Sequence, residues 1–268
     1  MNITPQQHAF ITGAASGIGN GIAHALSQRG VRVTIADIDA ATLAAVQGSL
    51  PSNHACVALD VRDVESWQRA KTEAERAFGP VDILINNAGV GFDGRDIVDT
   101  GADDLAAVMA INVLGVQNGI ATFGPGMRER ALGHIVNTAS VMGVLAGVPG
   151  MGAYSASKAA VVALSEALRG ELAPHGIGVS VLCPGLVRSK LRENTVKLGG
   201  VMTPDIDQRY VSKLAEMDPL VAGEIVVQGI SENFPYLLTH THYLSAVGQR
   251  AASIHDSATA VSAAFKPE

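Results

Sequence analysis

Short apolar runs alternate along the chain with segments of helical periodicity. The runs that read as strands are Ala9–Thr12, Val31–Ala36, Ala55–Leu59, Ile83–Ile85, His134–Thr138, Gly178–Leu182 and Tyr236–Leu238. Helices are predicted between them over Ile18–Gln28, Ala40–Gly48, Val64–Phe78, Asp103–Arg130, Ala153–Ala173 and Ala222–Ser231. Mostly apolar strands, each followed by a helix, are typical of a parallel sheet covered on both faces. The pattern therefore predicts an α/β fold, a doubly wound parallel sheet of about seven strands.

The segment from Leu186 to Leu220 interrupts this alternation. It mixes glycine and proline with short apolar pieces, so we expect a substrate flap over about 186–220. The end of the chain is rich in alanine and serine, and we expect it to fray over about 258–268. No other boundary is visible, so residues 1–268 are interpreted as a single domain.

Composition narrows the class of protein. Of the 268 residues, 47% are hydrophobic and 16% are charged, which favours a sizeable core over disorder. The net charge is −6 and the basic residues are scattered, so no nucleic-acid surface is expected. Met1–Gln7 has no signal-peptide pattern, and Val141–Gly152 is too short and broken to span a bilayer. The two cysteines, Cys56 and Cys183, are far apart in the sequence and form no metal or redox spacing. These features predict a cytoplasmic protein with reduced thiols and no membrane partner.

A glycine-rich loop, Thr12-Gly-Ala-Ala-Ser-Gly-Ile-Gly19, joins the first strand to the first helix. Gly13 permits a tight turn, Gly17 permits backbone to approach a phosphate, and Gly19 permits close helix–strand packing. The positive end of the helix then faces a pyrophosphate. Taken alone, such a loop can also be a tight turn without a ligand.

Two acidic residues follow the next strands. Asp37 ends the second strand, where a carboxylate can accept hydrogen bonds from the adenosine ribose hydroxyls. The alternative is an N-cap of the next helix, although Asp39 is better placed for that. Asp60 follows the third strand and can meet an adenine amino group, or be an ordinary turn residue.

Other polar positions gather after the fourth and fifth strands. Asn86-Asn-Ala-Gly89 brings small residues to a strand end, although Asn and Gly are also routine turn formers. Tyr154 and Lys158 lie on one helical face, and a nearby cation lowers a phenol pKa from about 10 toward working pH, as a general acid/base needs. Ser140 ends the fifth strand near the same space, and Asn112 stands inside a predicted helix, where Asn is a poor former.

In motif order, from about Ala9 to Ser189, the chain resembles the short-chain dehydrogenase/reductase family. The family's glycine loop matches Thr12–Gly19, and its Asn-Asn-Ala-Gly motif matches Asn86–Gly89. Its catalytic tetrad matches Asn112, Ser140, Tyr154 and Lys158, and its Pro-Gly pair matches Pro184-Gly185. Members usually carry Thr four residues after that glycine, where this chain has Ser189.

The resemblance implies a Rossmann-type domain that binds NAD and transfers a hydride. Tyr154 would exchange a proton with the substrate oxygen, Lys158 would tune Tyr154 and bind ribose, Ser140 would hold the substrate, and Asn112 would anchor a relay water. The implied cofactor contacts are Gly13, Ser16, Gly17, Ile18, Gly19, Asp37, Asp60, Val61, Asn87, Ala88, Gly89, Tyr154, Lys158, Pro184, Gly185, Val187 and Ser189.

The predicted substrate pocket is apolar. It comprises Met142, Leu145, Met151, Leu186 and Leu191, with Val141, Val144, Val148, Val201 and Met202 nearby. Bulky apolar residues favour a hydrophobic secondary alcohol or ketone. The Val-Asp-Gly-Gly ending of many acyl-carrier-protein reductases is missing, which places a role in fatty-acid synthesis in doubt.

Two alternatives belong to other classes. One is a nucleotide-sugar epimerase or dehydratase, although the chain after Gly185 is short for that substrate domain. The other is a non-catalytic regulator that senses the cofactor, against which the complete tetrad speaks. No metal is expected, since His240 and His242 lack acidic or cysteine partners nearby. Arg188, Lys190 and Arg192 can meet an anionic group or form a solvated face.

The helices Asp103–Arg130 and Ala153–Ala173 carry more apolar positions than one core-facing stripe uses. In relatives, these two helices pair with their symmetry mates. A homodimer or homotetramer is therefore expected.

Overall fold

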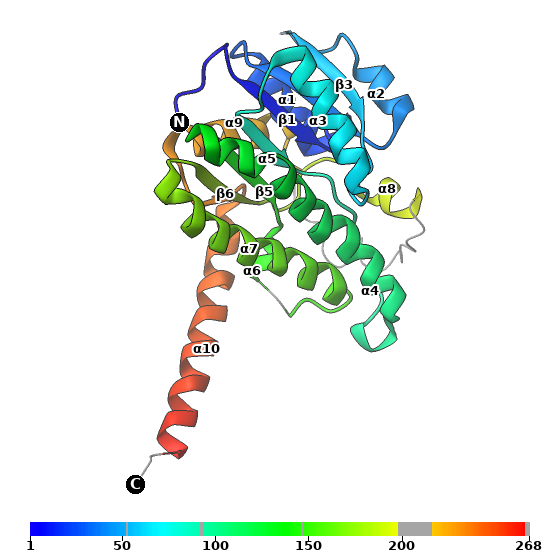
Figure 1. The fold of residues 1–268 in the computed structure, drawn as a ribbon. Helices are drawn as coiled ribbons and strands as arrows, with labels where there is room; N and C mark the ends of the chain where they lie inside the picture. The colour runs from blue at the N-terminus through cyan, green and yellow to red at the C-terminus, as the bar shows by residue number, and fades with distance from the viewer. Residues whose placement is uncertain (52, 92–93, 146, 198–215, 266–268) are drawn as a thin grey trace.

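A parallel sheet of seven strands forms the centre of the protein in the computed structural model, which describes residues 1–51, 53–91, 94–145, 147–197 and 216–265 (Figure 1). The strands are β1 (His8–Thr12), β2 (Arg32–Asp37), β3 (His54–Ala58), β4 (Ile83–Asn86), β5 (His134–Thr138), β6 (Gly178–Cys183) and β7 (Tyr236–Leu238). Their order is β3-β2-β1-β4-β5-β6-β7, and every neighbouring pair is parallel. The predicted α/β fold and its seven strands are confirmed.

Helices cover both faces of the sheet. They are α1 (Gly17–Ser27), α2 (Ala40–Val46), α3 (Val64–Phe78), α4 (Ala102–Met109), α5 (Gly115–Arg130), α6 (Val141–Val144), α7 (Gly152–Leu172), α8 (Leu191–Lys197), α9 (Pro219–Glu232) and α10 (Leu244–Ala264). Single turns also occur at η1 (Ile97–Asp99), η2 (Ala110–Leu114), η3 (Ala173–His175) and η5 (Thr241–Tyr243).

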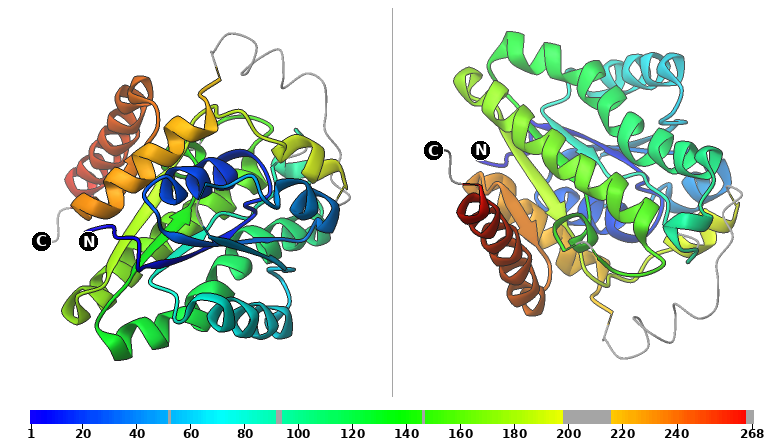
Figure 2. Two further views of the ribbon diagram at one scale, coloured as in Figure 1. Left: turned by 90° about the horizontal axis from the view of Figure 1, so that it is seen from above. Right: turned by 90° about the horizontal axis from the view of Figure 1, so that it is seen from below.

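Each layer of helices has its own apolar core against the sheet. One core joins α3, α5 and α7 to the sheet, and its centre is the aromatic group of Phe10, Trp67 and Phe123. The other core joins α1, α2 and α9 to the opposite face. Figure 2 shows α1 and α9 on one side of the strands and α3, α5 and α7 on the other. Burial on both faces explains why the strands are almost wholly apolar.

The strand order reverses between β1 and β4. At such a point the loops leaving the two strands diverge toward opposite faces, and a crevice opens beyond the carboxyl ends. The glycine loop follows β1, and Asn87–Gly89 follows β4. The topology therefore places the two motifs on either side of one crevice.

The predicted helix over Asp103–Arg130 is a continuous run from α4 to α5 with a π-helical turn, η2, inside it. Among the described residues, this run alone is long and apolar enough to cross a membrane by those two criteria. Ile111, Val116, Ile120 and Phe123 are buried in the core, so this is a core helix of the α/β fold.

Three of the described helices were not predicted from the pattern: the single-turn helix α6, α8 and α10. α8 lies within the segment expected to be a flap, of which residues 198–215 lie outside the described part. α10 continues to Ala264 and so includes the first part of the stretch that we expect to fray. Its many alanines are strong helix formers, which explains a helix in a segment that also contains serines.

Candidate active site

A cavity of about 560 Å³ opens at the carboxyl ends of the strands. Its lining includes most of the residues expected to bind a cofactor: Gly13, Ser16, Gly17, Ile18, Asp37, Asp60, Val61, Asn87, Ala88, Gly89, Tyr154, Lys158, Pro184, Gly185, Val187 and Ser189. Ser140, Met142, Met151, Leu186 and Leu191 also line it. Residues from six separate loops thus converge on one space.

The glycine loop adopts a conformation that other residues rarely take. Gly13 has φ of +61° and Gly17 has φ of +55°, both in the left-handed region. A Cβ on Gly13 would lie 2.8 Å from the Cα of Ala88, and one on Gly17 would lie 2.8 Å from the Cβ of Ser189. The glycine loop therefore packs closely against Ala88 on one side and Ser189 on the other. A side chain at either glycine would clash with these neighbours.

Gly19 is not among the residues that line the cavity. A Cβ there would lie 2.5 Å from Asn87 Nδ2 and 2.6 Å from the carbonyl oxygen of Gly13. Gly19 thus sits where the first turn of α1 packs against its neighbours, which matches the packing role predicted from sequence.

Thr12 joins the two loops, a role the sequence analysis missed. Its Oγ1 accepts hydrogen bonds from the backbone N–H groups of Asn87 and Ala88, each at 2.9 Å. Asn87 Nδ2 donates in return to the carbonyls of Thr12 and Gly13. These reciprocal bonds fix the width of the crevice at the reversal point of the sheet.

Asp37 holds the glycine loop from the end of β2. Its Oδ2 accepts from the N–H of Ala15 at 3.2 Å, and its Oδ1 accepts from the N–H of Asp39 at 3.1 Å. Asp39 caps α2 by accepting from the N–H of Thr42. The helix cap is therefore Asp39, and the carboxylate of Asp37 faces the cavity.

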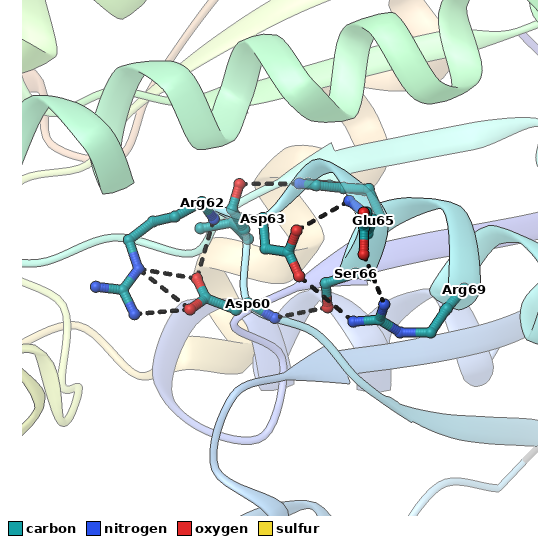
Figure 3. A network of polar contacts seen from close by, with 8 residues as sticks. Asp60, Arg62, Asp63, Glu65, Ser66 and Arg69 are labelled. Carbon is teal, nitrogen blue, oxygen red and sulfur yellow. Dashed lines mark hydrogen bonds and ion pairs between the residues drawn. The ribbon is translucent and has the colours of Figure 1, made fainter.

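Asp60 is held by a neighbouring arginine (Figure 3). Arg62 Nη2 lies 2.6 Å from Asp60 Oδ2, and Arg62 Nε lies 2.9 Å from Oδ1. These bonds lower the pKa of the Asp60 carboxyl, which therefore stays ionised. Both residues line the cavity, so its rim here carries a neutralised ion pair rather than a free carboxylate.

Ser140, Tyr154 and Lys158 come together at the base of the cavity. Ser140 caps α6, its Oγ accepting from the N–H of Met142 at 3.2 Å, and it hydrogen bonds with the Tyr154 phenol. Lys158 Nζ donates to the carbonyl oxygen of Thr138 at 3.0 Å and lies 5.8 Å from the centre of the Tyr154 ring. All three side chains are at least nine-tenths buried.

Burial dominates the electrostatics of this group. Desolvation raises the pKa of Tyr154, and the hydrogen bond with Ser140 lowers it by less. Desolvation also lowers the pKa of Lys158 to about 8. The sequence-based expectation that Lys158 brings the Tyr154 pKa down is therefore wrong for this arrangement. The phenolate loses more hydration in the buried site than its polar neighbours restore.

Asn112 lies in the π-helical turn and is fully buried. Its Oδ1 accepts from the N–H of Val90 at 2.9 Å, while its Nδ2 donates to the Val90 carbonyl and to Ser157 Oγ. It is outside the cavity lining, but a Cβ on Gly89 would lie 3.0 Å from its Oδ1 and 3.3 Å from Lys158 Nζ. Asn112 thus ties the segment after β4 to α7, directly behind Lys158.

The apolar part of the cavity differs from the prediction in several places. Leu145 is buried but does not line the cavity, because only the start of the single-turn helix α6 faces it and Leu145 follows its end. Val201 and Met202 lie outside the described residues. Tyr243, which sequence reasoning missed, lines the cavity from η5, and a Cβ on Gly185 would lie 2.7 Å from its ring.

The three basic residues after the Pro-Gly pair separate. Lys190 and Arg192 line the cavity, whereas Arg188 pairs with Asp218 at 2.5 Å. His240 and His242 stack edge to face, and no cluster of metal-ligating side chains occurs in the described part of the chain.

Residues 7–198 match the family model of the short chain dehydrogenases. The chain belongs to the short-chain dehydrogenase/reductase family. It is 36% identical over 240 residues to Oxidoreductase UcpA of Salmonella typhimurium, which covers 85% of this chain and 89% of that protein. It is 33% identical over 265 residues to C alpha-dehydrogenase of a Sphingobium species, covering 94% and 86%.

Solved structures of the same family superpose over nearly the whole chain. A short-chain dehydrogenase/reductase from Burkholderia phymatum in complex with NAD matches with a TM-score of 0.88 and 34% identity, covering 96% of this chain and 97% of that one. The apo form of LigO from Sphingobium sp. strain SYK-6 matches with a TM-score of 0.83 and 32% identity, covering 100% and 93%. The Rossmann-type fold is confirmed.

Proposed function

We propose that this short-chain dehydrogenase/reductase interconverts a hydrophobic secondary alcohol and its ketone with NAD(H), using Tyr154 as the general acid/base. The protein is an oxidoreductase by family, and NAD is its cofactor. The observation that carries the reaction is the contact of Ser140 with Tyr154 at the base of a cavity that also contains Lys158.

The residues present fit a dinucleotide. The left-handed glycines leave backbone free of side chains at the start of α1, where helix N–H groups and the helix dipole favour a pyrophosphate. Asp37 presents a carboxylate at the end of β2, as ribose hydroxyls require. Lys158 and Thr138 stand at the other end of the cavity, where they would hold the nicotinamide half. When bound, NAD accepts a hydride from the alcohol carbon and NADH returns it.

Proton transfer falls to Tyr154. Ser140 Oγ accepts from Met142, so its own hydroxyl hydrogen is available to donate to the Tyr154 oxygen or to a substrate oxygen. In reduction, the phenol donates its proton to the oxygen of the ketone. In oxidation, the phenolate takes the proton of the alcohol. Because burial raises the Tyr154 pKa, the phenol is protonated at neutral pH, ready for the reductive direction.

Lys158 has two roles in this proposal, one in positioning and one in electrostatics. Its hydrogen bond to Thr138 fixes the ammonium beside the Tyr154 ring. Charge development on the phenol oxygen is stabilised by that cation, which remains largely protonated below a pH of about 8.

The cavity walls around this group support the proposed substrate class. Met142, Met151, Leu186 and Leu191 provide bulky apolar surface, and Tyr243 adds an aromatic face. These walls favour an aryl or polycyclic secondary alcohol over a short aliphatic one.

A matched panel tests the proposal. Aryl and polycyclic secondary alcohols and short aliphatic ones are supplied with NAD, and NADH formation is followed by absorbance. We expect kcat/KM to be higher for the large apolar members. A preference for short alcohols would contradict the substrate class, and no turnover of any alcohol or ketone would contradict the reaction.

A further inference from the structure

Helix α10 stands apart from the rest of the molecule. It runs from Leu244 to Ala264 without one buried residue, and Figure 1 shows it extending away from the sheet and the other helices. At 1.5 Å per residue its length is about 32 Å. Arg250 Nη1 donates to the carbonyl of Val144 at 3.0 Å and so anchors the base of the helix to α6. Helices in proteins gain most of their stability from packing of an apolar face, which α10 lacks within one copy.

The larger apolar residues of this helix form a single stripe. They stand at Leu244, Val247, Ile254 and Val261, and Phe265 follows directly after the last residue of the helix. With Ala251 and Ala258 between them, the spacing is three, four, three, four, three and four residues. Every apolar side chain larger than alanine between residues 244 and 265 belongs to this heptad stripe, which is the pattern of a seam between two helices. Ile254 and Val261 are 63% and 58% exposed, so the outer part of the stripe is uncovered.

The stripe is also nearly symmetric about its centre. On either side of Ile254 come an alanine, then a valine, then a large residue. If two copies of α10 run antiparallel with Ile254 at the two-fold axis, Val247 faces Val261, because each lies seven residues from the axis. Ala251 then lies opposite Ala258, and Leu244 opposite Phe265, with an offset of one residue in each layer. Each layer then pairs residues of matching size, and the alanine layers permit close approach. An isologous interface requires this kind of self-complementarity.

Helix dipoles agree with the antiparallel direction. Two helices that run antiparallel place their dipoles in opposite directions, so the positive end of each helix lies beside the negative end of the other.

We propose that α10 is a dimerisation arm, which pairs antiparallel with α10 of a second copy of this chain around Ile254. The occupant of the exposed stripe is thus the same stripe on the partner. This surface is separate from the helices α5 and α7 that relatives use for pairing.

Disulfide trapping tests the axis. In the proposed pair, the Ile254→Cys variant places a cysteine opposite itself at the two-fold axis, and a disulfide forms where the two Cα atoms approach to about 4.4–6.8 Å. We expect mild oxidation to convert most of it to a covalent dimer. Ser253→Cys is the matched control, since its side chain points away from the seam. The unmodified chain, whose Cys183 is buried and Cys56 half-buried, controls for native thiols.

A second pair of variants tests the direction. In the antiparallel arrangement Val247 faces Val261, so neither Val247→Cys nor Val261→Cys should cross-link alone. A re-equilibrated mixture of the two variants should form the covalent heterodimer. Efficient cross-linking of each variant by itself would show a parallel pair and overturn the proposal.

The arm itself is tested with Ile254→Asp. We expect the mass by sedimentation to fall twofold, while turnover remains at the level of the unmodified enzyme, because the arm contains no site residue. Equal trapping of Ile254→Cys and Ser253→Cys, or none, would overturn the proposal. So would an unchanged mass, or a monomeric chain whose α10 binds anionic phospholipid vesicles through Ile254.

Discussion

The N–H of Ala15 and the carboxylate of Asp37 are joined by a hydrogen bond of 3.2 Å, which links the glycine loop to the end of β2. The other carboxylate oxygen of Asp37 accepts from the N–H of Asp39 at 3.1 Å, so the carboxylate is held at the cavity wall from both sides. No basic side chain stands in the loop, where Ala14, Ala15 and Ser16 follow Gly13, and Ile38 follows the strand. The glycine loop and the end of β2 thus present a carboxylate and no basic side chain of their own.

We expect NAD(H) to be preferred over NADP(H) by at least about tenfold in kcat/KM. Two like charges about 4 Å apart at an effective dielectric of about 20 repel by roughly 4 kcal/mol, and a third of that is about tenfold in affinity. The double change Asp37→Ser with Ile38→Arg should erode or reverse the ratio, since Ile38 is half exposed at the cavity rim.

Asp39→Asn is the control for this experiment. It removes the same charge two residues away and keeps an oxygen that can cap α2. The cofactor ratio of this variant should stay close to that of the unmodified enzyme. Equal efficiency with both cofactors in the unmodified enzyme would show that Asp37 does not face the ribose.

The Tyr154→Phe variant should lose turnover by at least about a hundredfold, because the proton-exchanging oxygen is removed. NADH affinity, measured by fluorescence titration, should hardly change. Tyr236→Phe is the matched control, since that phenol lies outside the cavity and bonds with Glu166. Near-full activity in Tyr154→Phe would show that another residue exchanges the proton with the substrate.

Alcohol oxidation should accelerate as pH rises, and ketone reduction should slow, because oxidation needs the Tyr154 phenolate. The Ser140 hydrogen bond lowers the Tyr154 pKa. In Ser140→Ala the midpoint of the oxidation profile should therefore move to higher pH, besides any loss in rate. A profile whose midpoint stays the same, or moves to lower pH, would show that Tyr154 is not the group that titrates.

Acid should destabilise the fold through His134. Burial lowers its pKa to about 3, and its Nε2 lies 2.9 Å from Ser180 Oγ, which itself donates to the Phe234 carbonyl. Below the unfolded pKa of about 6.5, the unfolded chain takes up a proton that the folded chain refuses until about pH 3. The contribution of His134 to the free energy of unfolding is therefore fully present above about pH 6.5. It falls as the pH decreases and is smaller by about 2 kcal/mol at pH 5.

Urea unfolding at pH 7.5 and pH 5 measures this loss. His134→Gln should reduce the difference between the two pH values by about 2 kcal/mol, because glutamine takes up no proton in either state. His175→Gln, at an exposed position in η3, should leave the difference unchanged. If both variants behave alike, His134 is not the acid-sensitive group.

A homodimer or homotetramer remains the expectation for the unmodified protein at micromolar concentration. Leu114, on the helical run from α4 to α5, is 57% exposed, as the excess of apolar positions predicted. Leu114→Glu should lower the mass found by light scattering, whereas Val64→Glu, at the start of α3, should not. A monomeric unmodified protein would refute both this expectation and the arm proposed above.

Sequence alone determined the elements whose signals are local. The limits of α3 were predicted to the residue, because Asp63 caps its start and Gly79, with φ of +79°, ends it. The strands were found because burial on both faces makes them apolar, and the motifs identified the family because their residues occur in a fixed order. These signals depend on near neighbours in the chain.

Other features were decided only by the tertiary structure. The π-helical turn at Asn112 depends on the bonds that this side chain makes with Val90 and Ser157, which are distant in sequence. The sign of the Tyr154 pKa shift depends on how completely the folded chain excludes water from the phenol, and no spacing of Tyr and Lys gives that quantity. Tertiary structure also decided the position of Leu145. Its apolar side chain suited a substrate pocket, but the residue follows the end of α6 and does not line the cavity. Side-chain chemistry can be read along the chain, whereas hydration and contact exist only once distant segments have packed together.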